Sequence, residues 1–125
     1  WADTQCSHQL AVQAASGVLS LPVDAIIGSP CSVDCLAIEA MTHLRGIPMI
    51  SHAATHPELS SKLQCPAFFR TVGSMPAYDG TIVGFLTHLG FRHAAPVYPV
   101  GSRFSLGWAS TLRGALARGG CIIDA

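Results

Sequence analysis

Apolar residues recur along the chain in two alternating patterns, and each pattern predicts a different kind of secondary structure. In four segments they return every three or four residues, which is the spacing of one helix face. These segments are residues 7–21, 32–45, 77–90 and 105–120. Between them lie short continuous apolar runs, which are typical of buried strands. These runs are residues 23–28, 47–51, 67–72, 92–100 and 121–125. The pattern therefore predicts strands and helices in alternation, with short connections.

This alternation predicts an α/β fold in which helices cover both faces of a parallel sheet. Ligands bind to such sheets outside the carboxyl ends of the strands. The sequence Gly-Ser-Pro-Cys-Ser at residues 28–32 follows a strand and opens a helix, where free backbone N–H groups gather. The next strand also ends in a polar loop. We therefore expect small hydroxyl residues of both loops to face one crevice, namely Ser29, Ser32, Ser51 and Thr55.

Composition and charge narrow the class of protein. Half of the 125 residues are hydrophobic and 11% are charged, so the chain can build a core. The formal net charge is zero, which favours neither a nucleic-acid partner nor a basic membrane-binding face. No apolar run reaches the roughly 18 residues of a membrane span, and the first residues lack the pattern of a signal peptide. We expect the chain to be an internal piece of a longer protein.

The five cysteines do not have the spacing of a metal centre. Cys31 and Cys35 form one C-x3-C pair, but no second pair follows, and His52 and His56 are too isolated to complete a zinc site. We therefore expect no metal ion and no cofactor. An odd count leaves at least one thiol without a partner inside the chain. The pattern favours disulfides in an oxidising compartment, and buried free thiols of a cytosolic protein are the alternative.

Several candidate residues also have a purely structural explanation. Ser32 is a good N-cap candidate, and this role alone would account for it. Arg70 lies inside a strand, where a charge needs a partner, so we expect a structural ion pair. We expect His52 and His56 on the surface of the polar loop, and Trp108 in the core or in a contact between subunits.

One set of motifs points to a known family. It comprises "IIGSPCS", "IPMIS", "ATHPELSSK", "FFRTV" and "GFRHAAPVY", which follow one another in one register without a large gap. With these motifs the chain resembles the extracellular ligand-binding region of the atrial natriuretic factor receptor family. That family has the type I periplasmic-binding-protein fold and includes receptor guanylyl cyclases and metabotropic glutamate receptors. The resemblance implies the same fold here, in partial form.

Within the family, the segment "QCSHQLAVQAASGVLSLPVDAIIGSPCS" looks most like receptor guanylyl cyclases of the natriuretic-peptide type. Their pattern implies a disulfide between Cys6 and Cys31. Such a bridge would clip the start of a helix to the elbow, and a loop of this size contributes about 3 kcal/mol in the chain-entropy model. Cys65 receives no assignment, whereas Cys35 and Cys121 are expected to be buried thiols.

The resemblance also implies a ligand site. In amino-acid-binding relatives, the serine after the elbow and an Ala-Thr pair in the next loop hold the ligand's carboxylate and amine. Ser32, Ala54 and Thr55 fall on these positions. The second lobe of such relatives usually adds an acidic stretch, but the present chain reads "YPVGSRF" there. The amino-acid pocket is therefore incomplete.

The family's chain crosses between two lobes after the "FFRT" strand, which implies a boundary within this chain. Residues 1–73 then belong to the first lobe, and residues 74–125 begin the second. We expect part of the extracellular ligand-binding region of a single-pass membrane receptor, best matched by a natriuretic-peptide-receptor-like guanylyl cyclase. The catalytic domain of such a receptor lies elsewhere, so we expect no enzymatic activity in this chain.

The expected partners follow from the same resemblance. They are an extracellular peptide or small-molecule ligand and a second copy of the chain, packed through first-lobe helices in a homodimer. Ligand binding would be transmitted by closure of the lobes or by rearrangement of the dimer. Two other classes are compatible with the sequence. One is a class C G-protein-coupled receptor or solute-binding protein, and the other is a soluble α/β enzyme domain.

Overall fold

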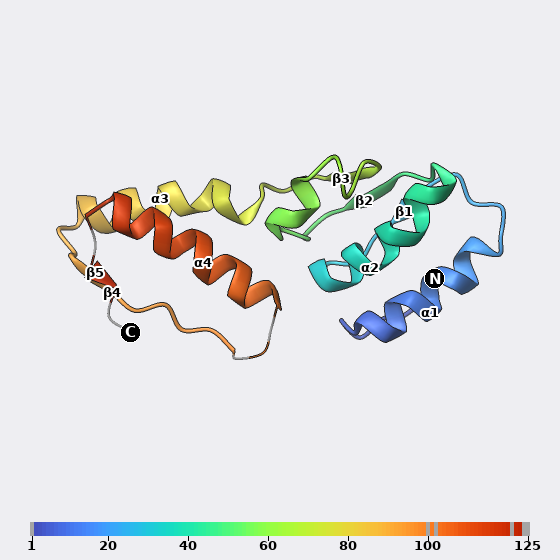
Figure 1. The fold of residues 1–125 in the computed structure, drawn as a ribbon, viewed down its shortest axis with the longest axis horizontal. Helices are drawn as coiled ribbons and strands as arrows, with labels where there is room; N and C mark the ends of the chain where they lie inside the picture. Colours follow the sequence, from blue (N-terminus) through green and yellow to red (C-terminus); the bar gives the residue numbers. More distant parts are fainter. Residues whose placement is uncertain (1, 100, 102, 121, 124–125) are drawn as a thin grey trace. The chain divides into compact units, whose positions relative to one another are not determined.

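The computed structural model describes residues 2–99, 101, 103–120 and 122–123. Contacts between residues divide the chain into two compact units, residues 1–72 and 73–125. The resemblance implied a lobe boundary one residue later, and the assignment of these units to lobes stays a prediction. Figure 1 shows helices and strands in both units. No helix within the described ranges is both long enough and apolar enough to cross a membrane.

The first unit is a three-stranded parallel sheet with two helices and two 3-10 turns. Its strands lie in the order β1-β2-β3, and both strand pairs are parallel. The elements in chain order are α1 (His8–Leu19), β1 (Ile26–Ile27), α2 (Ser32–Thr42), η1 (His43–Arg45), β2 (Met49–Ser51), η2 (Pro57–Ser60) and β3 (Phe68–Arg70). The predicted helices and parallel strands of this half are therefore confirmed, although the strands are shorter than the apolar runs.

The core of the first unit lies on one face of this sheet. Small residues of α1 pack against α2, and the same cluster includes Met49 of β2 and Phe68 of β3. Side chains alternate between the two faces of a strand. The residues that alternate with this core, Ile27, Ile50 and Phe69, are 89%, 44% and 52% exposed. The described part of the unit thus has one covered and one open sheet face.

Gly46 ends the segment that follows α2, as the sequence predicts. The last turn tightens into η1, and Gly46 has a φ of 66°, in the left-handed region. Its N–H bonds to the carbonyl of His43 at 3.0 Å. Leu44 belongs to the apolar period of residues 32–45, which predicts it on the buried helix face, but this tightening changes the direction of the side chain and Leu44 is 78% exposed. That expectation was wrong because a 3-10 turn has a different periodicity from an α-helix.

The second unit consists of a helix pair and a two-stranded parallel sheet. Its elements are α3 (Met75–His88), β4 (His93–Ala94), α4 (Arg103–Arg118) and β5 (Ile122–Ile123). Val83 of α3 packs with Leu112, Ala115 and Leu116 of α4, and Trp108 lies partly buried against this cluster. Figure 1 shows α3 and α4 side by side, in agreement with this shared core.

The apolar periods of residues 77–90 and 105–120 predict Leu89 and Leu106 on the inward faces of their helices, but the two side chains are 49% and 55% exposed and lie outside the shared core. Those two predictions were wrong. The strand predicted over residues 92–100 is confirmed but shorter, since within the described residues it is paired only at His93–Ala94. Pro96 and Pro99 follow, and proline has no N–H to donate to a sheet. The buried thiol expected at Cys121 lies outside the described residues.

Candidate functional site

The loop between β1 and α2 is the elbow that the sequence singled out, and a disulfide holds it. Cys6 and Cys31 are bonded to each other, with their Cα atoms 5.5 Å apart. The structure thus contains the bridge that the resemblance implies. Gly28 begins the elbow at a crowded position, since a β-carbon would lie 3.0 Å from the Met49 sulfur and the methionine side chain would have to shift.

Asp34, which the sequence analysis missed, is the centre of the elbow's polar contacts. Its carboxylate is fully buried and accepts hydrogen bonds from the hydroxyls of Thr4 and Ser29, the latter at 2.8 Å. The Ser29 hydroxyl in turn accepts the N–H of Cys31 at 3.0 Å. An acidic residue in the first turn of a helix is favoured by the helix dipole, and this signal could have identified Asp34.

Ser51, at the end of β2, joins the elbow to the next loop. Its hydroxyl donates to the carbonyl of Ser29 at 2.8 Å and accepts the N–H of Ala54 at 3.0 Å. Ser51 itself has no exposed surface. The two strand ends are therefore brought together, as predicted, but these serine hydroxyls bond to the protein itself.

Ser32 does not cap α2, so this structural prediction was wrong. The N-cap residue is Cys31, and α2 begins at Ser32. The Ser32 hydroxyl instead accepts the N–H of His56 at 3.2 Å, and the residue is 6% exposed. This bond ties the start of α2 to the loop after β2.

His56 was expected on the surface, and it is buried, with 3% exposure. It precedes Pro57 and caps the turn η2, because its Nδ1 accepts the N–H of Glu58 at 3.2 Å. A capping side chain must fold back over its own turn, and the sequence analysis did not weigh this role for histidine. His52 is exposed, as predicted.

Arg70 holds the other side of the same loop. Its guanidinium donates to the carbonyls of Ala54 and His56, each at 3.2 Å, and also to the Ser60 hydroxyl. Carbonyl oxygens thus stabilise the charge that the sequence places in a strand. Residues 54–56 are held between α2 and β3 by these contacts.

The structure brings Ser32, Ala54 and Thr55 together, since Ser32 bonds to the residue after Thr55. Ser32 and Ala54 are buried. Thr55 is half-buried, and its hydroxyl makes no hydrogen bond within the described residues. Of the three predicted ligand residues, Thr55 therefore offers a free polar group. Their binding of a ligand stays a prediction.

A cavity of about 410 Å³ is lined by residues of α1, of β1 and of the elbow. Its lining includes Thr4, Val18 of α1, Ile27 of β1, and Ser29 and Pro30 of the elbow. None of the three predicted ligand residues lines it. The cavity and the loop of residues 54–56 are therefore two distinct places in the first unit.

The sulfur atoms offer no nucleophile or metal ligand among the described residues. Cys35 and Cys65 are free and buried, which confirms the buried thiol predicted at Cys35. Burial raises the pKa of the Cys35 thiol from 9.0 to about 11, and it also raises the pKa of Cys65. Side-chain atoms of Cys6, Cys31 and Asp34 lie within 4.8 Å of one another, but disulfide sulfurs are not thiolate ligands.

Comparison with solved structures identifies the class of fold. Over 98% of its length, the chain superposes on the crystal structure of a leucine-binding protein from Thermotoga maritima with a TM-score of 0.87. Sequence identity is 22%, and the superposed part is 35% of that protein. The chain therefore has part of a type I periplasmic-binding-protein fold, and it spans about a third of this neighbour.

The family follows from the sequence itself. The model of the ANF-receptor family, described as a receptor family ligand binding region, matches residues 2–123. The chain belongs to this family, which confirms the resemblance. Comparison with curated protein sequences found no match. The ligand-binding character of the chain rests on this family membership together with its fold.

Proposed function

We propose that the chain is part of the extracellular ligand-binding region of a single-pass membrane receptor of the guanylyl cyclase class. Its ligand is an extracellular peptide or small molecule. Binding is transmitted by lobe closure or by rearrangement of a homodimer. The chain itself carries out no catalysis, because the cyclase domain of such a receptor is a separate part of the protein.

The observation that carries this proposal is the disulfide between Cys6 and Cys31 at the elbow. In the resemblance to natriuretic-peptide-type receptors, this pair is the feature that favours their class over other family members. A disulfide also agrees with an oxidising compartment such as the cell exterior. Asp34 also connects the two segments that the disulfide joins. Its carboxylate accepts hydrogen bonds from the hydroxyl of Thr4, which precedes Cys6, and from the hydroxyl of Ser29 in the elbow.

The experiment that tests this proposal is to determine the coding sequence on both sides of residues 1–125. We expect a signal peptide before the chain, and one membrane span followed by a kinase-like and a cyclase segment after it. Seven spans would instead assign the protein to the class C receptors. A reading frame with neither signal peptide nor span would contradict the receptor proposal and favour a soluble α/β protein.

A second candidate function is binding of a free amino acid, and the free hydroxyl of Thr55 favours it. The solved neighbour is named as a leucine-binding protein, so leucine is a suitable probe. If this function holds, leucine will bind in calorimetry and Thr55→Ala will abolish the binding. Thr71→Ala is a matched control, because Thr71 is an exposed threonine outside the loop. Unchanged binding by Thr55→Ala would contradict this function.

A further inference from the structure

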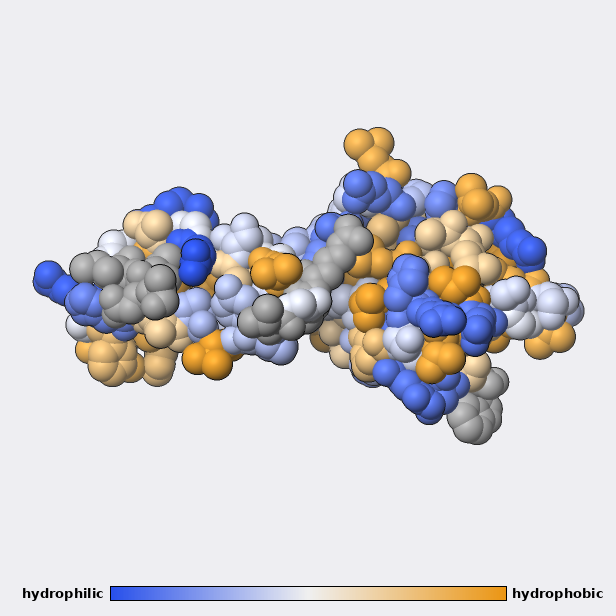
Figure 2. All heavy atoms as spheres, turned by 60° about the horizontal axis from the view of Figure 1, so that its bottom comes forward, coloured by the Kyte–Doolittle hydropathy of each residue, from blue (hydrophilic) through white to orange (hydrophobic). Residues whose placement is uncertain are grey.

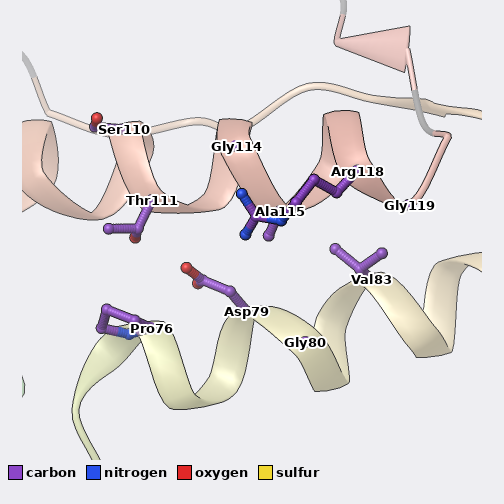
Figure 3. Close-up of a pocket in the computed structure, with 10 residues that line it drawn as sticks. All are labelled: Pro76, Asp79, Gly80, Val83, Ser110, Thr111, Gly114, Ala115, Arg118 and Gly119. Carbon is purple, nitrogen blue, oxygen red and sulfur yellow. The ribbon is translucent and has the colours of Figure 1, made fainter.

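A cavity of about 620 Å³ lies between α3 and α4 within the second unit. Figure 3 shows the carboxyl group of Asp79 pointing from α3 toward α4 across this space. Pro76 and Val83 form apolar walls beside it, and the backbone of Gly114 forms part of the opposite side. This volume is in the range of small-molecule sites.

Asp79 is a buried carboxylate with an unsatisfied oxygen. The residue is 4% exposed, and its Oδ1 has no hydrogen-bond partner in the described part of the chain. The nearby Thr111 hydroxyl donates to the carbonyl of Trp108 at 3.0 Å, so it points to its own helix. A buried carboxylate oxygen that lacks a hydrogen-bond donor is unfavourable, so this position favours a positively charged occupant with N–H groups.

The cationic side chain in the lining of the cavity is Arg118, which is exposed. Its guanidinium lies along α4: a β-carbon at Gly114 would be 3.3 Å from Nη1. In Figure 3 it lies over Ala115, and it makes no hydrogen bond to Oδ1 of Asp79. Arg118 therefore places a positive charge near the cavity without satisfying the buried oxygen.

We propose that this cavity binds a small organic ammonium ion, with the carboxylate of Asp79 as its counter-ion. An ammonium group has N–H donors that match the unsatisfied oxygen, and Pro76 and Val83 would contact its hydrocarbon part. A metal ion is a poorer match, because calcium and magnesium prefer several oxygen ligands. This site is independent of the proposed function, whose candidate residues all lie in the first unit.

The test is a titration of the ¹⁵N-labelled 125-residue chain with benzylammonium, followed by NMR. We expect saturable shifts of the backbone amides of Asp79, Gly80 and Gly114. Benzyl alcohol, which has the same shape without the charge, should produce no saturable shift. Asp79→Asn should weaken binding at least about tenfold, because it removes a charge-assisted hydrogen bond. Asp24→Asn is the matched control, since Asp24 is an exposed aspartate outside the cavity.

Arg118→Gln provides a second variant that keeps the buried carboxylate in place. It should strengthen binding of benzylammonium by about threefold, because it removes a nearby like charge. Equal binding of the alcohol, or binding unchanged in Asp79→Asn, would overturn the proposal. The absence of a saturable shift would also overturn the proposal, and in that case we would ask whether both Asp79→Asn and Arg118→Gln lower the Tm. A lower Tm in both variants would show that the two side chains form an internal ion pair in solution.

Discussion

Asp34, in the first turn of α2, stabilises the elbow through side-chain hydrogen bonds. Asp34 has no exposed surface and accepts hydrogen bonds from Thr4, two residues before Cys6, and from Ser29, two residues before Cys31. A carboxylate that accepts two hydroxyl bonds in a buried place is difficult to replace. The elbow is therefore held by this carboxylate as well as by the bond between two cysteines.

We expect Asp34→Ala to lower the free energy of unfolding by about 2 kcal/mol, because the part-buried hydroxyls of Thr4 and Ser29 lose their shared acceptor. Urea denaturation measures this loss. Asp24→Ala is the matched control, since Asp24 is an exposed aspartate. Its effect should stay within about 0.5 kcal/mol. If the loss in Asp34→Ala were as small as that in Asp24→Ala, the Asp34 contacts would contribute no stability.

Cys35 gives a prediction about pH. Burial raises the pKa of its thiol to about 11, so folding favours the neutral form. This contribution is fully present below pH 9 and is lost as the pH rises toward 11. Between pH 8 and pH 10 the protein should lose about 1 kcal/mol more stability than Cys35→Ala. Urea denaturation at each pH measures the free energy of unfolding of both proteins. If the two free energies fall in parallel between pH 8 and pH 10, the Cys35 thiol does not cause the loss.

The positions of the candidate site residues could be predicted from the sequence, but their hydrogen-bond partners could not. The hydroxyl residues after the two strands do come together, because carboxyl ends of parallel strands share one edge of a sheet. Which atom bonds to which depends on packing, so Ser32 bonds to the His56 N–H and not to its own helix. Burial of His56 and Asp34 was missed for the same reason, since both are polar residues stabilised by tertiary contacts.

At the scale of elements, the helices follow the sequence pattern closely and the strands do not. The helix predicted over residues 7–21 is α1 (His8–Leu19), since its period of apolar residues continues over several turns. Of the described residues 92–99, only His93 and Ala94 are paired with another strand. Pairing requires a partner strand and free N–H groups, and an apolar run specifies neither of them.

Two glycines in the helical segments should respond in opposite directions to substitution by alanine. Gly46 has a φ of 66°, so Gly46→Ala should cost about 1 kcal/mol of the free energy of unfolding. Gly84 lies inside α3, and a β-carbon added there would meet no atom within 4 Å, so Gly84→Ala should stabilise by about 0.5–1 kcal/mol. Thermal unfolding of both variants measures the signs. A stabilising Gly46→Ala would contradict the left-handed turn.

At the scale of the whole molecule, the chain leaves apolar surface in contact with solvent. Figure 2 shows hydrophobic side chains between polar ones on the face it presents. On the sheet of the first unit, Ile27 pairs in register with Ile50, and Ile50 with Phe69, so their exposed side chains form one row. A row of this kind is typical of a surface that another part of a protein covers.

This row should bind a hydrophobic dye. We expect the fluorescence of 1-anilinonaphthalene-8-sulfonate to rise with the chain and to fall in Ile50→Thr, which removes the central apolar side chain and keeps the β-propensity. Leu63→Thr is the control, because Leu63 is 97% exposed but lies outside the strands. If Leu63→Thr lowers the fluorescence as much as Ile50→Thr, the dye does not bind to this row.

The disulfide has a consequence for the covalent integrity of the chain. Cys6 and Cys31 lie on either side of α1 and of the exposed segment that follows it, which includes Leu21, Pro22 and Asp24. The disulfide closes residues 6–31 into a covalent loop, so a protease that cuts in this segment opens the loop and does not release a fragment. The two pieces then remain one molecule, with α1 attached through a sulfur–sulfur bond alone. Such cleavage becomes visible as two polypeptides only after a reductant is added.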